Sequence, residues 1–188
     1  MEVDKSGRHG LSCQRAEGRH SRHSQANDLI KRALASAQVP AIREPPGLSR
    51  QDGKRPDGLT LLPWAQGRSL VWDFTCSDTV APSHINQTSQ EAGRAAVQAE
   101  KKKLMHYEAL AASGFTVMPV AVETLGSWAP MGLKFIQDIG SRIADCTGEK
   151  RSTSFLFQAL SIATQRGNAA SIAGTVPSMK KLDEVYYL

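Results

Sequence analysis

The chain has 188 residues, enough for one domain of ordinary size but not for two. Its formal net charge of +5 at pH 7 mildly favours an anionic partner such as nucleic acid. The three cysteines are odd in number and widely spaced, with no secretory signal, which fits a reducing, intracellular compartment without a disulfide framework. No apolar stretch approaches the roughly 20 residues of a membrane-spanning helix, so no membrane partner is expected.

Residues 1–23 form a basic segment rich in Arg, His, Ser and Gly, whose lack of hydrophobic periodicity predicts disorder. Within it, His9 and Cys13 have the spacing of the second half of a zinc knuckle. A structural zinc site takes four ligands and no earlier cysteine exists, so we interpret the segment as a remnant that does not bind metal. One folded domain is expected over residues 24–173, followed by a flexible tail over residues 174–188.

Residues 24–37 have the pattern of an amphipathic helix, with Asp28 in its first turn, where an acidic residue suits the helix dipole. A short strand is predicted at residues 39–43 and is ended by a Glu-Pro-Pro-Gly sequence. The polar loop that follows carries cations that can contact DNA phosphates, namely Arg50, Lys54 and Arg55.

Two acidic residues stand where strand chemistry disfavours them. Asp57 precedes a short apolar run, and Asp73 lies in the middle of the apolar strand expected at residues 70–76. A carboxylate near a core is costly unless it is paired or bound to a metal. Residues 63–68 carry Pro and Gly and predict a hairpin connection, so the two acids can converge on one divalent cation such as Mg²⁺. The alternative is a turn role for Asp57 and a bulge or edge role for Asp73.

A basic helix is predicted at residues 87–112, which contain no Pro, one Gly and many strong helix formers. Lys103 and Tyr107 are four residues apart on it and share a face. A lysine beside two metal-binding carboxylates can orient or deprotonate a water, or neutralise charge on a phosphate. Lys101 and Lys102 lie off this face and are placed to touch a phosphate backbone, although a run of lysines is usually a solvated surface.

The rest of the chain predicts a strand at residues 115–123, a helix at residues 131–146 and a final helix capped by Thr153. Pro119 lies within the strand, which places that strand at an edge or at a bulge of its sheet. The expected order is helix, three strands, helix, strand and then helices. The expected fold class is therefore α/β, a mixed β-sheet flanked by helices, with the two acids at one strand edge.

Asp57 after Pro56, Asp73 on the next strand and a lysine on the following helix resemble the PD-(D/E)XK nuclease pattern. More closely, the chain is similar to the restriction-endonuclease-like domain at the C-terminus of non-LTR retrotransposon polyproteins. The matching stretches within residues 22–166 are RHSQANDLIKRAL (22–34), EPPGLSRQDGKRPDGLTLLPW (44–64), SLVWDFT (69–75), AEKKKLMHY (99–107), MPVAVETLG (118–126) and TSFLFQALSIATQR (153–166). The usual motif has a lysine two residues after the second acid, where this chain has Thr75.

The resemblance implies a restriction-endonuclease-like core and a metal-dependent DNA endonuclease that nicks a target site, leaving a 3′-hydroxyl to prime reverse transcription. It implies Mg²⁺ or Mn²⁺ held by Asp57, Asp73 and the backbone carbonyl of Phe74. Lys103, in place of the motif lysine, would act on the attacking water or the phosphate, with Tyr107 packed below it. It also implies a DNA partner, a nuclear location and an origin as a truncated piece of a reverse-transcriptase polyprotein.

A second hypothesis is a degenerate retroelement remnant that binds nucleic acid without cutting it, and Thr75 in the lysine position favours it. The two hypotheses differ in metal dependence, since binding to phosphates alone weakens with salt and needs no Mg²⁺. A third hypothesis is a small-molecule enzyme on an α/β scaffold. It is not supported, because the sequence has neither a phosphate-cradling Gly loop nor a nucleophile constellation.

Overall fold

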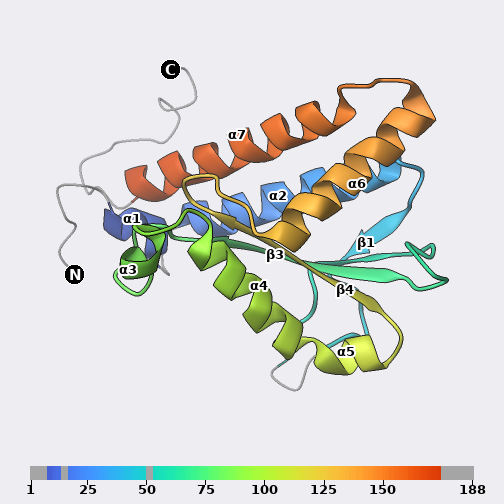
Figure 1. Ribbon diagram of the computed structural model, residues 1–188, viewed down its shortest axis with the longest axis horizontal. Helices are drawn as coiled ribbons and strands as arrows, with labels where there is room; N and C mark the ends of the chain where they lie inside the picture. Colours follow the sequence, from blue (N-terminus) through green and yellow to red (C-terminus); the bar gives the residue numbers. More distant parts are fainter. Residues whose placement is uncertain (1–7, 14–16, 50–52, 175–188) are drawn as a thin grey trace.

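The computed structural model describes residues 8–13, 17–49 and 53–174 of the chain (Figure 1). The helices of this part are α1 (Arg8–Ser12), α2 (Glu17–Ser36), α3 (Ile85–Thr88), α4 (Arg94–His106), α5 (Glu108–Ala112), α6 (Pro130–Thr147) and α7 (Ser152–Ala173). The strands are β1 (Ala41–Arg43), β2 (Gly58–Thr60), β3 (Leu70–Ser77) and β4 (Thr116–Glu123). None of the described helices is long and apolar enough to cross a membrane.

The described strands form one mixed sheet in the order β1-β2-β3-β4. β1, β2 and β3 are antiparallel neighbours, with Gly58 opposite Trp72. β4 runs parallel to β3, with Val120 opposite Phe74, because α4 and α5 carry the chain back along the sheet before β4 begins. The predicted α/β class with a mixed sheet flanked by helices is confirmed. The prediction from Pro119 is confirmed too, since β4 is an edge strand of this sheet.

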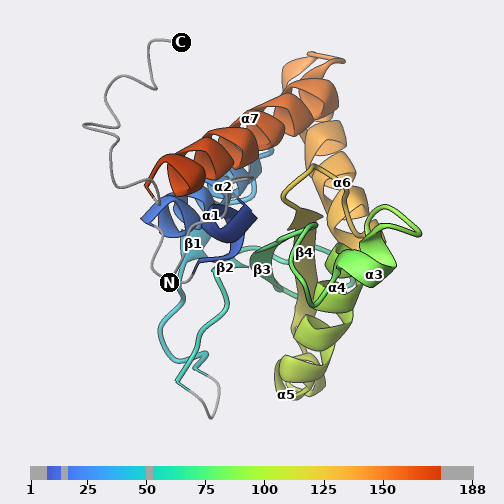
Figure 2. The ribbon, with the colours of Figure 1, turned by 90° about the vertical axis from the view of Figure 1, so that its left-hand side faces the viewer.

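The alternation of side chains along β3 separates the core of the protein from its candidate site. Trp72 and Phe74 point into the main core, where they meet Ile30 of α2, Phe135 of α6 and other apolar side chains of α2, α6 and α7. Asp73 points to the opposite face of the sheet, where α4 packs over β3 and β4. Figures 1 and 2 show α2, α6 and α7 on one side of the sheet, with α4 and α5 on the other.

Two glycines allow close approaches that other residues would block. A Cβ on Gly58 would overlap the indole ring of Trp72, the residue opposite it in the β2–β3 ladder. A Cβ on Gly167 of α7 would overlap the Arg22 side chain of α2. The Gly that follows Asp57 is therefore required by packing, because it lets the large core side chain of β3 lie directly against β2.

Two predictions of local structure differ from what is observed. The expected disorder of residues 1–23 is wrong for α1 and for residues 17–23, which begin α2. Buried Arg22 in these first turns is fixed by Asn168 of α7, a polar contact that leaves no hydrophobic periodicity to detect. The continuous helix expected at residues 87–112 is wrong as well, since Gly93 with φ of +87° is the N-cap of α4 and Tyr107 separates α4 from α5.

Gly58→Ala is expected to destabilise the protein by about 1–3 kcal/mol, the usual range for overpacking a core. The new methyl group must displace the indole ring of Trp72, which is fully buried. The free energy of unfolding from urea titration measures the effect. Leu62→Ala in the exposed part of the same hairpin is the control and should change stability by no more than about 0.5 kcal/mol. Equal stability of the two variants would contradict the close-packing interpretation.

Candidate active site

Asp57 is fixed to the strand that carries the second acid. Its backbone N–H donates to the carbonyl oxygen of Trp72 at 2.9 Å. Its Oδ2 accepts the backbone N–H of Phe74 at 2.6 Å. These two bonds straddle Asp73, so both carboxylates line one pocket of about 250 Å³. The convergence of Asp57 and Asp73 expected from the sequence is therefore what the structure shows.

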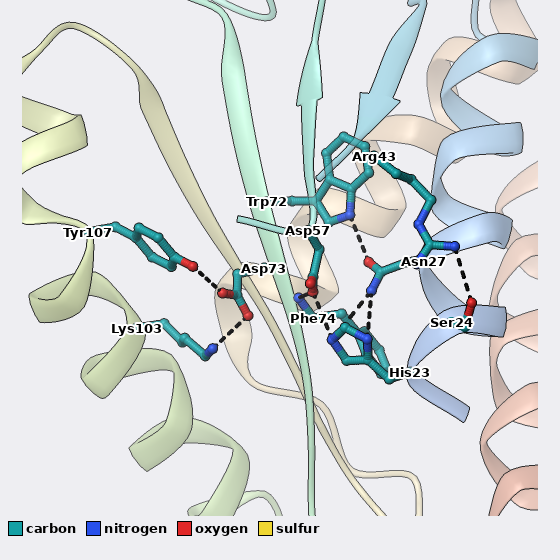
Figure 3. Close-up of polar contacts among 10 residues, drawn as sticks. All are labelled: His23, Ser24, Asn27, Arg43, Asp57, Trp72, Asp73, Phe74, Lys103 and Tyr107. Atoms are coloured by element: carbon teal, nitrogen blue, oxygen red, sulfur yellow. Dashed lines mark hydrogen bonds and ion pairs between the residues drawn. The ribbon is translucent and has the colours of Figure 1, made fainter. Parts of the chain in front are cut away.

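The two residues expected from the following helix both contact Asp73, as Figure 3 shows. Lys103 Nζ lies 2.7 Å from Asp73 Oδ1, and only 8% of the Asp73 side chain is exposed. The Tyr107 hydroxyl donates to Asp73 Oδ2 at 2.5 Å. Tyr107 is buried at the C-terminal end of α4, so its ring also closes one wall of the pocket. Asp73, Lys103 and Tyr107 form a single charged and hydrogen-bonded unit.

The surroundings of Asp73 disfavour its ionised form. Burial raises the pKa of Asp73, and the nearby charge of Asp57 raises it further. The ammonium of Lys103 and the hydroxyl of Tyr107 act in the opposite direction but do not cancel the shift. The ionised form of Asp73 is thus destabilised by its surroundings, and a further cation beside the two acids would stabilise it.

His23 of α2 is the site residue that sequence reasoning missed. Its Nε2 lies 3.0 Å from Asp57 Oδ2, and its ring packs edge-on against the ring of Phe74 with centroids 6.0 Å apart. The hydrogen bond to Asp57 is the main cause of a raised His23 pKa, although burial opposes it. His23 lies at the end of the segment expected to be disordered, and also within the first stretch that carries the family resemblance, residues 22–34. Its place within that stretch is the signal in the sequence that points to it.

A chain of contacts from the core supports His23 (Figure 3). The indole N–H of Trp72 donates to Asn27 Oδ1 at 2.9 Å, and Asn27 is fully buried. The amide nitrogen of Asn27 lies 3.4 Å from His23 Nδ1. Since Trp72 also packs on Gly58 beside Asp57, the same core side chain orients both ends of the His23–Asp57 contact.

The cations expected to bind DNA are not all brought to the acids. Lys54 and Arg55 line the pocket that contains Asp57 and Asp73, and Arg55 also pairs with Glu44 at 3.3 Å. Arg50 lies outside the described residues. Lys101 and Lys102 are exposed on α4, and Lys101 lines a separate hollow beside α3.

Asp28, the acidic residue in the helix predicted at residues 24–37, lies apart from the pocket. It pairs with Arg43 at 2.7 Å and lines a hollow between α2 and α7. His23, five residues earlier on α2, is the α2 side chain that reaches the acids. The helix α2 therefore contributes to the site the His23 imidazole that contacts Asp57, and not the Asp28 carboxylate.

The donor set fits a hard divalent cation. Asp57 and Asp73 supply carboxylate oxygens, and Mg²⁺ is commonly held by one or two carboxylates while it keeps waters and shares substrate phosphates. The N–H of Phe74 faces Asp57, and in an extended residue the C=O points to the same side, so the Phe74 carbonyl is directed to this strand edge. Within the described part of the chain, no group of three or more His, Cys, Asp and Glu side chains is arranged to hold a metal.

No protein-family model matches the chain, and a search of curated proteins found no significant match.

The His23–Asp57 contact predicts a pH-dependent stability. Because the folded pKa of His23 is raised, its contribution is fully present below about pH 6.5, the unfolded value, and is lost as pH rises through the folded pKa. His23→Gln should therefore destabilise the protein more at pH 6 than at pH 9 in urea titrations with chelator. In an Asp57→Asn background this pH dependence should disappear or reverse, because burial, which lowers the pKa of His23, is no longer outweighed by the contact with Asp57. The same pH dependence in both backgrounds would show that Asp57 is not the cause.

Proposed function

We propose that this chain is a metal-dependent DNA endonuclease domain with a restriction-endonuclease-like core, derived from a retroelement. The observation that carries the proposal is the meeting of Asp57, Asp73 and Lys103 in one pocket. Asp57 directly precedes β2, Asp73 lies on the adjacent strand β3 and Lys103 on the next long helix, which is the arrangement that the PD-(D/E)XK resemblance implies. The mixed sheet with helices on both sides is compatible with such a core.

Asp57, Asp73 and the Phe74 carbonyl would hold Mg²⁺ or Mn²⁺. When bound, the ion supplies Lewis-acid polarisation of the scissile phosphate and a lowered pKa of a bound water. Tyr107 keeps the Asp73 carboxylate in a fixed orientation, and His23 does the same for Asp57. The pocket is therefore organised before substrate arrives, which reduces the cost of assembling the reacting geometry.

Lys103 has the position and charge for the remaining task. Its ammonium, 2.7 Å from Asp73, can orient the attacking water and offset the negative charge that develops on the phosphate. Water attack forms a new bond from oxygen to phosphorus and breaks the bond from phosphorus to the 3′-oxygen, which leaves as a hydroxyl after taking up a proton. Lys54 and Arg55 at the pocket wall would contact neighbouring phosphates.

The primary test is nicking of supercoiled plasmid with Mg²⁺, with Mn²⁺ and with chelator. Asp57→Asn and Asp73→Asn are each expected to abolish metal-dependent nicking while circular dichroism shows an intact fold. The matched control is Asp138→Asn, an acid on the exposed face of α6 that pairs with Lys134, and it should nick as the wild type does. Nicking by Asp73→Asn would refute the site, whereas salt-sensitive DNA binding without any nicking would favour the remnant that only binds.

A second test concerns the position of the lysine. Lys103→Ala should lower the nicking rate by about 10²–10³-fold, as loss of a group that stabilises transition-state charge does. Thr75 and Lys103 line the same hollow, and Thr75 shares a strand face with Asp73, so a lysine at 75 can reach the same acid.

Adding Thr75→Lys to the Lys103→Ala variant should therefore restore part of the activity. Thr75→Arg in the same background is the control, since it keeps the charge but is a bulkier group that cannot give up a proton at neutral pH. Equal rescue by Lys and Arg would show that charge alone is required at this position. No rescue by Thr75→Lys, with the fold intact, would contradict the equivalence of the two positions.

A further inference from the structure

A second, larger hollow adjoins the pocket of the two acids. Its volume is about 490 Å³, within the roughly 300–1,000 Å³ of small-molecule sites. It shares His23 and Lys103 with the pocket of Asp57 and Asp73, so the two hollows are neighbours. Its other walls come from the first turns of α2 and from β3 beyond Asp73.

The lining of this hollow is basic. Arg19, His20 and Arg22 face it from α2, and no acidic side chain is among the described residues that line it. Arg19 donates to the backbone oxygen of Ser12 at 3.2 Å, and Arg22 donates to the side-chain oxygen of Asn168 at 2.5 Å. Neither guanidinium forms an ion pair with a carboxylate in the described part of the chain.

The remaining polar groups of the hollow carry no negative charge. Burial raises the pKa of the Cys76 thiol to about 11, which keeps it neutral at physiological pH. The Thr75 hydroxyl can donate to an anion and stands where the related motif has a lysine. A largely buried cation such as Arg22, only 2% exposed, is favoured when an anion lies beside it.

We propose that this basic hollow binds a phosphodiester of the nucleic-acid strand, next to the phosphate held at Asp57 and Asp73. This inference rests on the proposed function, which supplies the nucleic-acid strand as the ligand. The phosphate contact in the hollow would fix that strand on the α2 side of the acids. Arg19 and His20 supply the phosphate contact, and the Thr75 hydroxyl adds a donor. Lys103 and His23 form the border between this contact and the acid pair.

The test is the salt dependence of DNA binding in chelator, measured by fluorescence anisotropy with a short duplex. Loss of one phosphate contact lowers the slope of log K against log salt by about 0.9. Arg19→Gln/His20→Gln is expected to show this drop together with weaker binding at low salt. Arg32→Gln, an exposed arginine farther along the same helix, loses a charge outside the hollow and should leave the slope unchanged.

Further variants separate phosphate binding from a structural role. Arg19→Lys keeps the charge and should retain the wild-type slope. If the guanidinium had a purely structural role, lysine would not replace it and the slope would fall. If the double variant fails to fold, His20→Gln alone replaces it, because His20 is exposed, and a smaller drop is expected. An unchanged slope in a folded variant overturns the proposal.

The ligand source is tested with inorganic phosphate in calorimetry. Binding of phosphate weaker than about millimolar is expected, since a single anion makes only part of the contacts that a strand makes. Tight phosphate binding with an unchanged DNA slope would mean a site for free phosphate, and would overturn the strand as the ligand.

These binding outcomes are independent of cleavage. A slope difference without any nicking would refute the endonuclease and support the phosphate site. Nicking with an unchanged slope would support the endonuclease and refute the phosphate site.

Discussion

A carboxylate in the middle of a strand, with a core side chain on either side of it, remains ionised only where cations and donors surround it. At Asp73 the cation and the donor both come from α4 and its C-terminal end, as Lys103 and Tyr107. The end of α4 coincides with this contact, since Tyr107, whose hydroxyl reaches Asp73, leaves helical geometry with ψ of 18°. The break between α4 and α5 thus lies at the residue that contacts the acid on β3.

Two other buried acids hold α4 in the place that this contact needs. Glu123, at the end of β4, accepts the backbone N–H of Ala95 in the first turn of α4 at 2.9 Å. Glu100, in the middle of α4, accepts the N–H of Met131 in the first turn of α6 at 2.9 Å. Carboxylates are stabilised at helix N-termini, where N–H groups lack partners within the helix. These acids therefore have a structural explanation, whereas Asp57 and Asp73 face a shared pocket and each other's charge.

Much of the fold and part of the site could be predicted from the sequence, and the difference has a physical origin. Apolar periodicity in the sequence predicts β3, β4, α6 and α7, and Asp73 is recognisable because it interrupts such a pattern. His23 could not be found in this way. It reaches Asp57 through a tertiary contact between α2 and the sheet, in turns whose buried side chains are polar and pair with distant partners, such as Arg22 with Asn168. Pairings of this kind over long sequence separation leave no local pattern.

The electrostatics of the pocket separate the two hypotheses more sharply than the identity of residue 75 does. A protein that only binds phosphates gains nothing from two carboxylates in its binding pocket, since their charge repels the ligand. It would also be more stable with a neutral residue at 73, because the pKa of Asp73 is raised by burial and by Asp57. Both costs are removed when a divalent cation lies between the acids and the phosphate. The acid pair thus favours metal-dependent chemistry, while the basic hollow beside it is suited to binding alone.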